Sequence, residues 1–325
     1  MRELPDIEDQ RGLVSTSQLR TAGWSRSAIS RFVRSRGWSP LPGVVYGHRT
    51  TLDDDQRVIA GWLWAGPASA LTGGWGLVRH GLVLAARPVL RRFVVADPCH
   101  SRVVDDVEVL HVHHAPTFRN LSGVPVVPLD RALIDYARGF EATADSVRAV
   151  TIRALQTGLT SPARLEAALG ETRPNGTRGI RSGLIDFERG AWSVPEAQLL
   201  RILSRRRPRL KLQMNPRLVD TSGRLIGVPD CYLPDHRVAI QVHSWTHHAG
   251  FHGARDQWAD TVDADARYIP HGIAVLPVSP TVLRDHPERF LRLLDGVLSA
   301  QQGRAKVDIR IEVAVEPTPL APHAS

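Results

Sequence analysis

The sequence predicts an α/β protein, α+β overall, built from three successive regions. Three observations support this expectation. Residues 11–50 combine short amphipathic helices with an apolar strand, residues 89–127 contain strand patterns, and the chain after residue 180 follows the order α–β–β–β–α–β–α. With 325 residues, the chain has room for two or three domains of ~150 residues each. We place them at 1–51, 52–170 and 181–300, with a linker at 171–180 and a strand extension and tail at 301–325.

The charge balance favours an anionic partner. The formal net charge is +8, and nearly all positive charge is arginine, because Lys211 and Lys306 are the only lysines. Arginine suits bidentate contacts to phosphate and guanine, although a GC-rich coding bias would produce the same excess. Cys99 and Cys231 lie far apart and indicate neither a disulfide framework nor a cysteine zinc site. Without a targeting segment or a long apolar run, we expect a cytoplasmic protein with no membrane partner.

Residues 11–50 predict a winged helix-turn-helix. Ser15 can cap a first helix, with Gln18 as its capping-box partner. Ser25 can cap a second helix, and residues 38–46 resemble a β-hairpin with a Pro-Gly turn. In such a module the second helix enters the major groove of DNA and the hairpin touches the backbone.

The second of these helices carries the candidate DNA contacts. Ile29, with the two apolar residues three and four positions later, forms one buried face. Arg26, Arg31 and Arg34 fall largely outside that face and are the predicted DNA-binding residues. A basic helical hairpin used for protein contacts is the alternative.

This region resembles the N-terminal winged helix of AbiEi-type antitoxins. The matching residues are Gly12-Leu13-Val14, Leu19, Gly23, Ile29 and Pro42-Gly43-Val44-Val45-Tyr46. The resemblance implies that the module binds double-stranded DNA, often at its own promoter, and that a cognate toxin is a possible partner. Residues 68–82 resemble the continuation of that family, as a helix followed by a His-Gly-Leu sequence.

The middle region, residues 52–170, predicts a small α/β unit. Residues 89–96 and 107–112 alternate as strands, and residues 123–127 and 129–137 predict a strand followed by a helix. After the charged segment 171–180, the densest basic run of the chain spans residues 205–211. Its members Arg205, Arg206 and Arg207 are the second set of predicted DNA-binding residues.

A hairpin at residues 227–248 carries the chemistry. Asp230 opens its first strand, and Gln241 and His243 form a polar pair that emerges from its second, apolar strand. Glu196 lies in the first turn of an earlier helix capped by Ser193. A carboxylate, a turn and a polar pair in this order are typical of nucleases of the PD-(D/E)xK type.

Residues 190–298 resemble the very-short-patch-repair-like endonuclease domain that follows an AbiEi-type winged helix in actinobacterial proteins. Glu196 matches the helix acid, Asp230 matches the strand acid and His248 matches the trailing histidine of that pattern. Gln241 and His243 stand where the family has two acids. The resemblance therefore implies a restriction-endonuclease-like fold with Glu196, Asp230, Gln241 and His243 at a degenerate catalytic position.

Three functions follow from this pattern. Phosphodiester hydrolysis needs Mg²⁺ held by one or two carboxylates, and Gln241 and His243 do not supply them. The preferred prediction is a DNA-binding regulator of the antitoxin type with an inactive nuclease-like domain and no certain cofactor. An active endonuclease that uses Mg²⁺ or another divalent metal is the first alternative, and a toxin-neutralising interaction module is the second.

Two further expectations concern the end of the chain. Asp230, His243 and His248 could hold a metal that imidazole suits, such as Zn²⁺ or Mn²⁺, with a polar loop as the alternative. Residues 307–315 alternate apolar and charged side chains, which predicts a strand at a sheet edge or in a dimer.

Overall fold

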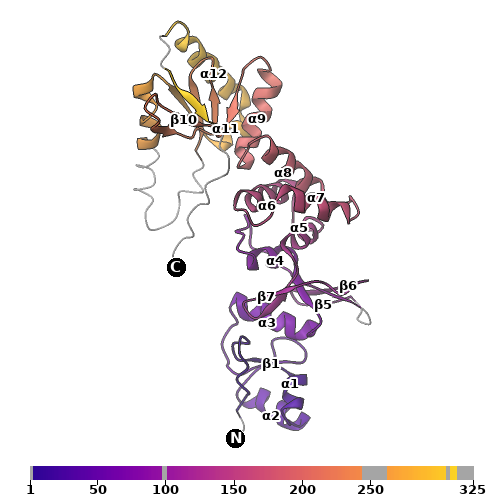
Figure 1. The fold of residues 1–325 in the computed structure, drawn as a ribbon. Coiled ribbons are helices and arrows are strands. Elements are labelled where there is room, and N and C mark those ends of the chain that lie inside the picture. The colour runs from indigo at the N-terminus through magenta and orange to yellow at the C-terminus, as the bar shows by residue number, and fades with distance from the viewer. Residues whose placement is uncertain (1–2, 97–100, 244–261, 305–307, 313–325) are drawn as a thin grey trace. The chain divides into compact units, whose positions relative to one another are not determined.

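The computed structural model describes residues 3–96, 101–243, 262–304 and 308–312 (Figure 1). Its helices and mixed sheets make the chain an α/β protein, as the sequence predicts. The chain divides into two compact units: the first holds Met1–Ala154 and Leu159–Arg181, and the second holds Leu155–Gly158 and Ser182–Ser325. No helix within the described ranges is both long and apolar enough to cross a membrane.

The first unit begins with two short helices between two strands. In order these are β1 (Leu13–Ser15), α1 (Thr16–Thr21), α2 (Arg26–Ser35) and β2 (Val44–Tyr46). β1 and β2 pair antiparallel, with Leu13 opposite Tyr46. This pairing brings the chain after α2 back to the strand that leads into α1.

The hairpin predicted within residues 38–46 is reduced to a single bridge between Trp38 and Tyr46. The backbone N–H of each residue donates to the carbonyl of the other, at 3.3 and 3.0 Å. Pro40 and Pro42 lie between them and have no N–H to donate, so this side cannot extend the ladder. The predicted hairpin is therefore confirmed only at this one antiparallel bridge, and β2 uses β1 as its main partner.

Both predicted helix starts are confirmed. The Ser15 hydroxyl accepts from the backbone of Gln18, and the Gln18 side chain accepts from the backbone of Ser15 at 2.8 Å. The Ser25 hydroxyl accepts from the backbone of Ala28 at 3.2 Å. Each cap satisfies an N–H that the first helical turn leaves without a partner. These short helices therefore begin where local side chains can close their first turn.

The middle of the first unit is a sheet of six strands with helices. Its strands lie in the order β5-β6-β4-β3-β8-β7. The elements are α3 (Asp54–Ala65), β3 (Ala70–Thr72), α4 (Gly73–Arg79), β4 (Arg91–Ala96), β5 (Arg102–Val104), β6 (Val107–Val112), β7 (Arg119–Leu121), β8 (Val124–Val126), α5 (Leu129–Ala137), α6 (Ala144–Gln156) and α7 (Pro162–Gly170). The predicted strands near 89–96, 107–112 and 123–127 and the predicted helix 129–137 are confirmed.

The helix predicted over residues 68–82 was wrong in its first part. Ala70–Thr72 form β3, and all three residues are buried between β4 and β8 in the sheet. Helix α4 then starts at Gly73, which has a φ of +64°. Local pattern favoured one continuous helix, but the two neighbouring strands determine the backbone here, and sheet placement overrides propensity.

One hydrophobic core spans the boundary that we predicted at residues 51 and 52. Buried residues on both sides belong to the same cluster, among them Leu13, Leu41 and Tyr46 before it and Val58 and Phe93 after it. The region of α1 and α2 is therefore packed on the sheet region rather than joined to it by a free connection.

The segment predicted as a linker, residues 171–180, has fixed contacts. The Arg138 guanidinium donates to the carbonyls of Arg173 at 2.6 Å and Asn175 at 3.2 Å. Thr177 is buried, and α8 (Arg178–Glu188) begins inside the segment. The segment still lies where the chain passes from the first unit to the second.

The described residues of the second unit form two sheets. Strands β14-β13-β12-β9 form one, in which β13 and β14 are parallel, and β11-β10-β15 form the other. The elements are α9 (Val194–Arg206), β9 (Gln213–Met214), β10 (Arg217–Val219), β11 (Leu225–Gly227), β12 (Cys231–Leu233), β13 (Val238–Val242), η2 (Ile269–His271), β14 (Ala274–Val278), α11 (Pro280–Asp285), α12 (Pro287–Gln301) and β15 (Arg310–Glu312). Residues 262–266 are helical.

Two features differ from the simple order of elements that the sequence predicts. The first strand of the predicted order is divided at Asn215, and its halves β9 and β10 belong to different sheets. Asn215 is buried with a φ of +49°, a conformation that asparagine tolerates better than most residues. Strand β15 pairs antiparallel with β10 at a sheet edge, which confirms the predicted edge strand for residues 310–312.

Candidate functional site

Helix α2 presents positive charge away from its buried face. Ile29 is buried in a small core, and the Trp24 and Phe32 rings meet edge to face at 5.7 Å between centroids. Arg26 and Arg31 are exposed, as is Arg34. Within the described ranges, no ion pair or side-chain hydrogen bond involves these three guanidinium groups.

The surroundings of α2 strengthen this positive field. The sequence contains no Asp or Glu between residues 11 and 50. Arg49, also exposed, donates to the backbone carbonyl of Arg34 at 2.7 Å, which places another guanidinium beside the helix. Among the arginines of this segment, Arg11 at its edge is the one with an ion pair to a described residue, because it pairs with Asp53 and Asp55 at 3.3 and 3.2 Å.

The basic run at residues 205–211 has a different character. Arg206 pairs with Glu288 at 2.7 Å, and Arg207 pairs with Asp295 at 2.6 Å. Both acids lie on α12, more than 80 residues along the chain. Of the three predicted DNA-binding arginines of this run, only Arg205 is exposed without an ion pair among the described residues. The run therefore supplies less net positive charge than its sequence predicts.

Two carboxyl groups of the second unit lie close to each other. Ser193 caps α9, and this cap fixes Glu196 in the first turn, as predicted. Glu196 is buried, and its Oε2 accepts from the Asn215 side chain at 2.7 Å and from the Trp192 backbone at 2.9 Å. Burial raises the pKa of Glu196, and the hydrogen bond from Asn215 partly opposes this.

Asp230 immediately precedes β12 and completes the acid pair. Its Oδ2 accepts from the backbone of Val242 at 2.6 Å, and its carbonyl accepts from the backbone of Asn215 at 3.1 Å. Burial of its carboxyl group and then the charge of Glu196 raise the pKa of Asp230 to about 7. Asn215 therefore connects both acids, through its side chain to one and its backbone to the other.

Gln241 lies on β13 beside Asp230, as the hairpin predicts, but its amide group is already engaged. Its Oε1 accepts from the backbone of Asp230 at 3.3 Å, and its Nε2 donates to the hydroxyl of Tyr268 at 3.4 Å. A neutral amide thus occupies the place of a third acid. Tyr268 is buried, and no pattern in the sequence singles it out.

His243 continues this site toward the helix that follows it in the chain. Its Nε2 lies 3.0 Å from Oδ2 of Asp265, and this hydrogen bond is the main reason that the pKa of His243 is raised. The Oδ1 atom of Asp265 is buried without a hydrogen-bond partner among the described residues. Sequence reasoning missed Asp265, which lies in the helical residues 262–266.

The described residues do not fit a divalent metal. Among them, no three His, Cys, Asp or Glu side chains lie close enough together to hold one ion. Glu196 and Asp230 each accept hydrogen bonds from the protein, and the oxygen of Gln241 is occupied as well. His248, the third member of the predicted metal set, lies outside the described residues.

Comparison with known proteins assigns no family to the chain. No protein-family model matches the chain, and no curated protein matches it either.

Proposed function

We propose that this chain is a double-stranded DNA-binding protein of the antitoxin or transcriptional-regulator type, with α2 as the helix that enters the major groove. The observation that carries the proposal is the set of exposed arginines on α2 that have no ion-pair partner among the described residues. Arginine contacts to phosphates supply sequence-independent affinity, and contacts to guanine supply discrimination.

The geometry around α2 suits a winged helix-turn-helix in residues 1–51. Two helices separated by four residues, with strands before and after them, present one helix for a groove about 12 Å wide. The short segment between Trp38 and β2 then serves as the wing. Its exposed residues Pro42 and Gly43 lie at the turn, where close approach to a DNA backbone is possible.

For the second unit, we propose a PD-(D/E)xK-type fold that has lost metal-dependent cleavage. The acid pair Glu196 and Asp230, the β12–β13 hairpin and the parallel strand β14 support the fold. Gln241 supports the loss, because its neutral amide hydrogen-bonds Asp230 and Tyr268 where a metal-binding acid is expected. Glu196 and Asp230 remain as carboxyl groups, but burial raises the pKa of both and so opposes the charged forms that Mg²⁺ prefers.

The competing function is an active DNA endonuclease. Its best support is the acid pair of Glu196 and Asp230, in which burial first and then the charge of Glu196 raise the pKa of Asp230, as at many catalytic acids. Incubating supercoiled plasmid with the protein and Mg²⁺, Mn²⁺ or Zn²⁺ separates the two functions. We expect no nicking above the level of Asp230→Asn. Nicking by the natural protein that Asp230→Asn abolishes would establish the endonuclease.

DNA binding is tested by the salt dependence of affinity. Fluorescence anisotropy with a duplex at several salt concentrations gives the slope of log K against log salt, about 0.9 for each phosphate neutralised. We expect Arg26→Ala, Arg31→Ala and Arg34→Ala together to reduce the magnitude of that slope by about 2 to 3. A slope that stays at its natural value would remove α2 from the DNA interface.

A further inference from the structure

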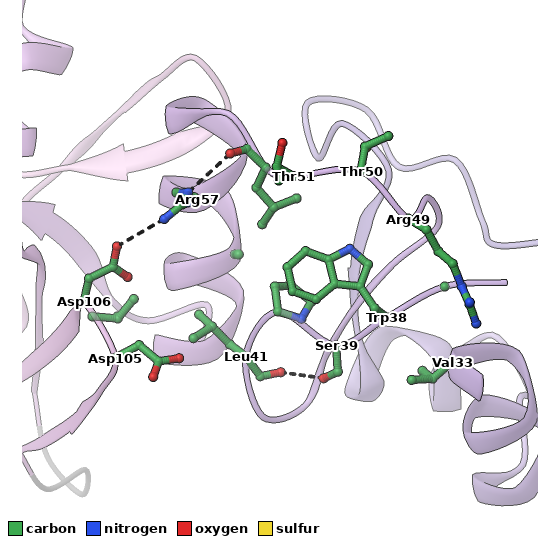
Figure 2. A pocket seen from close by; sticks show the side chains of 15 residues that line it. Val33, Trp38, Ser39, Leu41, Arg49, Thr50, Thr51, Arg57, Asp105 and Asp106 are labelled. Atoms are coloured by element: carbon green, nitrogen blue, oxygen red, sulfur yellow. Dashed lines mark hydrogen bonds and ion pairs between the residues drawn. The ribbon is translucent and has the colours of Figure 1, made fainter. Parts of the chain in front are cut away.

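The first unit contains a pocket of about 810 Å³ beside α2 (Figure 2). Its walls come from five stretches: Val33 of α2, the residues that follow α2 (37–41), residues 49–52, helix α3, and the turn between β5 and β6 (105–107). A volume of this size suits a small organic ligand. The pocket shares Val33 and residues 37–41 with the proposed winged helix, but the turn between β5 and β6 has no part in the DNA-binding proposal.

The apolar part of the pocket centres on an indole. Trp38 is 37% exposed although large aromatic side chains are usually covered. Leu41 and Leu52, both buried, also line the pocket. Figure 2 shows the Trp38 ring in the middle of the pocket, with Arg49 on one side and Asp105 and Asp106 on the other. A flat group can therefore stack on an aromatic surface that the fold leaves open.

The polar part of the pocket has one acid without a compensating charge. Arg57 donates to the carbonyl of Leu52 at 3.3 Å and lies 3.9 Å from Asp106, which also pairs with Arg91. Asp105, in contrast, is exposed, and no ion pair or hydrogen bond involves its side chain within the described ranges. Its φ of +47° belongs to a tight turn that fixes the residue at the pocket wall.

We propose that this pocket binds a flat organic cation, with its ring on Trp38 and its charged nitrogen at Asp105. An aromatic face attracts a cation through its quadrupole, and a carboxylate adds a charge-assisted hydrogen bond. The two groups come from different parts of the chain, and both line this one concavity. The binding does not rest on the proposed DNA function.

The test uses benzamidinium as the probe and neutral benzamide as its uncharged match. Ligand-observed NMR titration of the full chain without DNA gives both affinities. For ligands of this size we expect a Kd for benzamidinium of about 0.1–1 mM and binding of benzamide at least about tenfold weaker. Equal binding of the two probes, or no binding of benzamidinium, would overturn the proposal.

Two variants locate the probe. Asp105→Asn keeps a residue that tolerates positive φ, so the turn is preserved while the charge is removed. We expect it to weaken benzamidinium about tenfold and to leave benzamide unchanged, and Trp38→Ala to weaken both probes. Glu166→Gln, on the exposed surface of α7, is the matched control that removes an acid elsewhere. If Glu166→Gln weakens benzamidinium as much as Asp105→Asn does, the pocket is not the site.

The outcome is independent of DNA binding. A protein that binds benzamidinium through Asp105 but shows no salt-dependent DNA binding would contradict the proposed function and support the pocket. A protein that binds DNA through α2 but does not bind benzamidinium would support the proposed function and contradict the pocket proposal.

Discussion

Helix α2 and the basic run at residues 205–211 look alike in the sequence but differ in the structure. Both are rich in arginine, and the run is the denser of the two. In α2 the guanidinium groups project from a region without acids, whereas in the run Arg206 and Arg207 are paired with acids of α12. The number of arginines in a segment therefore does not measure its positive field, because the fold determines which acids lie beside those arginines.

This difference has an electrostatic meaning. A cation already paired with a carboxylate must lose that partner before it binds phosphate, so its gain from DNA is reduced. An unpaired cation neutralises a phosphate and releases a counterion without such a loss. The contrast predicts that α2, with fewer arginines nearby in sequence, carries most of the affinity for DNA.

The largest expected effect compares two triple alanine variants. Replacing Arg26, Arg31 and Arg34 should weaken binding to duplex DNA by about 100-fold at low salt, because three uncompensated contacts are lost. Replacing Arg205, Arg206 and Arg207 should weaken it by less than about fivefold, since two of these charges are paired. Anisotropy titrations at one salt concentration measure both. A larger loss in the second variant would reverse the assignment of the two surfaces.

The acid pair Glu196 and Asp230 of the second unit contrasts with these ion pairs, because two groups that carry the same charge are buried together. The folded pKa of Asp230, about 7, lies above its ordinary value of 3.8. Between these values the native state holds a proton that the unfolded chain has released, so stability falls as the pH rises through this window and the loss is complete above pH 7.

Asp230→Asn should remove that loss. Its amide oxygen can still accept from the Val242 backbone. At pH 8 the variant should therefore have a free energy of unfolding about 1–2 kcal/mol higher than that of the natural protein, and a higher unfolding temperature. Near pH 4 the two proteins should have nearly equal stability. Thermal unfolding across this range measures the effect, with Asp308→Asn, an exposed acid of the same unit, as the control. A variant that is less stable at pH 8 would show that Asp230 has a stabilising partner.

Local features of the fold were predictable because they depend on neighbours in the chain. Ser15, Ser25 and Ser193 each cap a helix through residues three positions away, and all three starts were read from the sequence. The strand β3 was not predicted, because its conformation depends on β4 and β8 rather than on its own residues. The sequence pattern thus predicts the helix starts, but it misses a strand whose conformation is determined by its partners in the sheet.

The candidate site divides in the same way. Asp230 and Gln241 were found because a hairpin pairs residues at fixed spacing, and the structure brings them into contact. Asn215 and Asp265 were not found, since their contacts with Glu196 and His243 cross long stretches of chain. A buried asparagine between two strands and an acid in a mostly exposed helix have no periodic signal that distinguishes them.

A charge-release variant tests why the basic run is weak. Glu288→Gln with Asp295→Asn keeps the side-chain shapes but removes the acids that pair with Arg206 and Arg207. We expect DNA affinity at low salt to rise by about threefold, and this gain to disappear at high salt. The matched control is Glu166→Gln in the first unit. If the double variant binds no better than the control, ion pairing is not what limits the run.

The smallest expected effect concerns stability. Arg207 donates to both carboxylate oxygens of Asp295, at 3.2 and 2.6 Å, while Arg205 has no such partner within the described ranges. Because the Arg207 pair is at the surface and screened by solvent, Arg207→Ala should lower the free energy of unfolding by less than about 1 kcal/mol. Arg205→Ala should leave it unchanged, and chemical denaturation of both variants measures the difference. Equal losses would mean that the methylene stems of these side chains, rather than the ion pair, stabilise the end of α9.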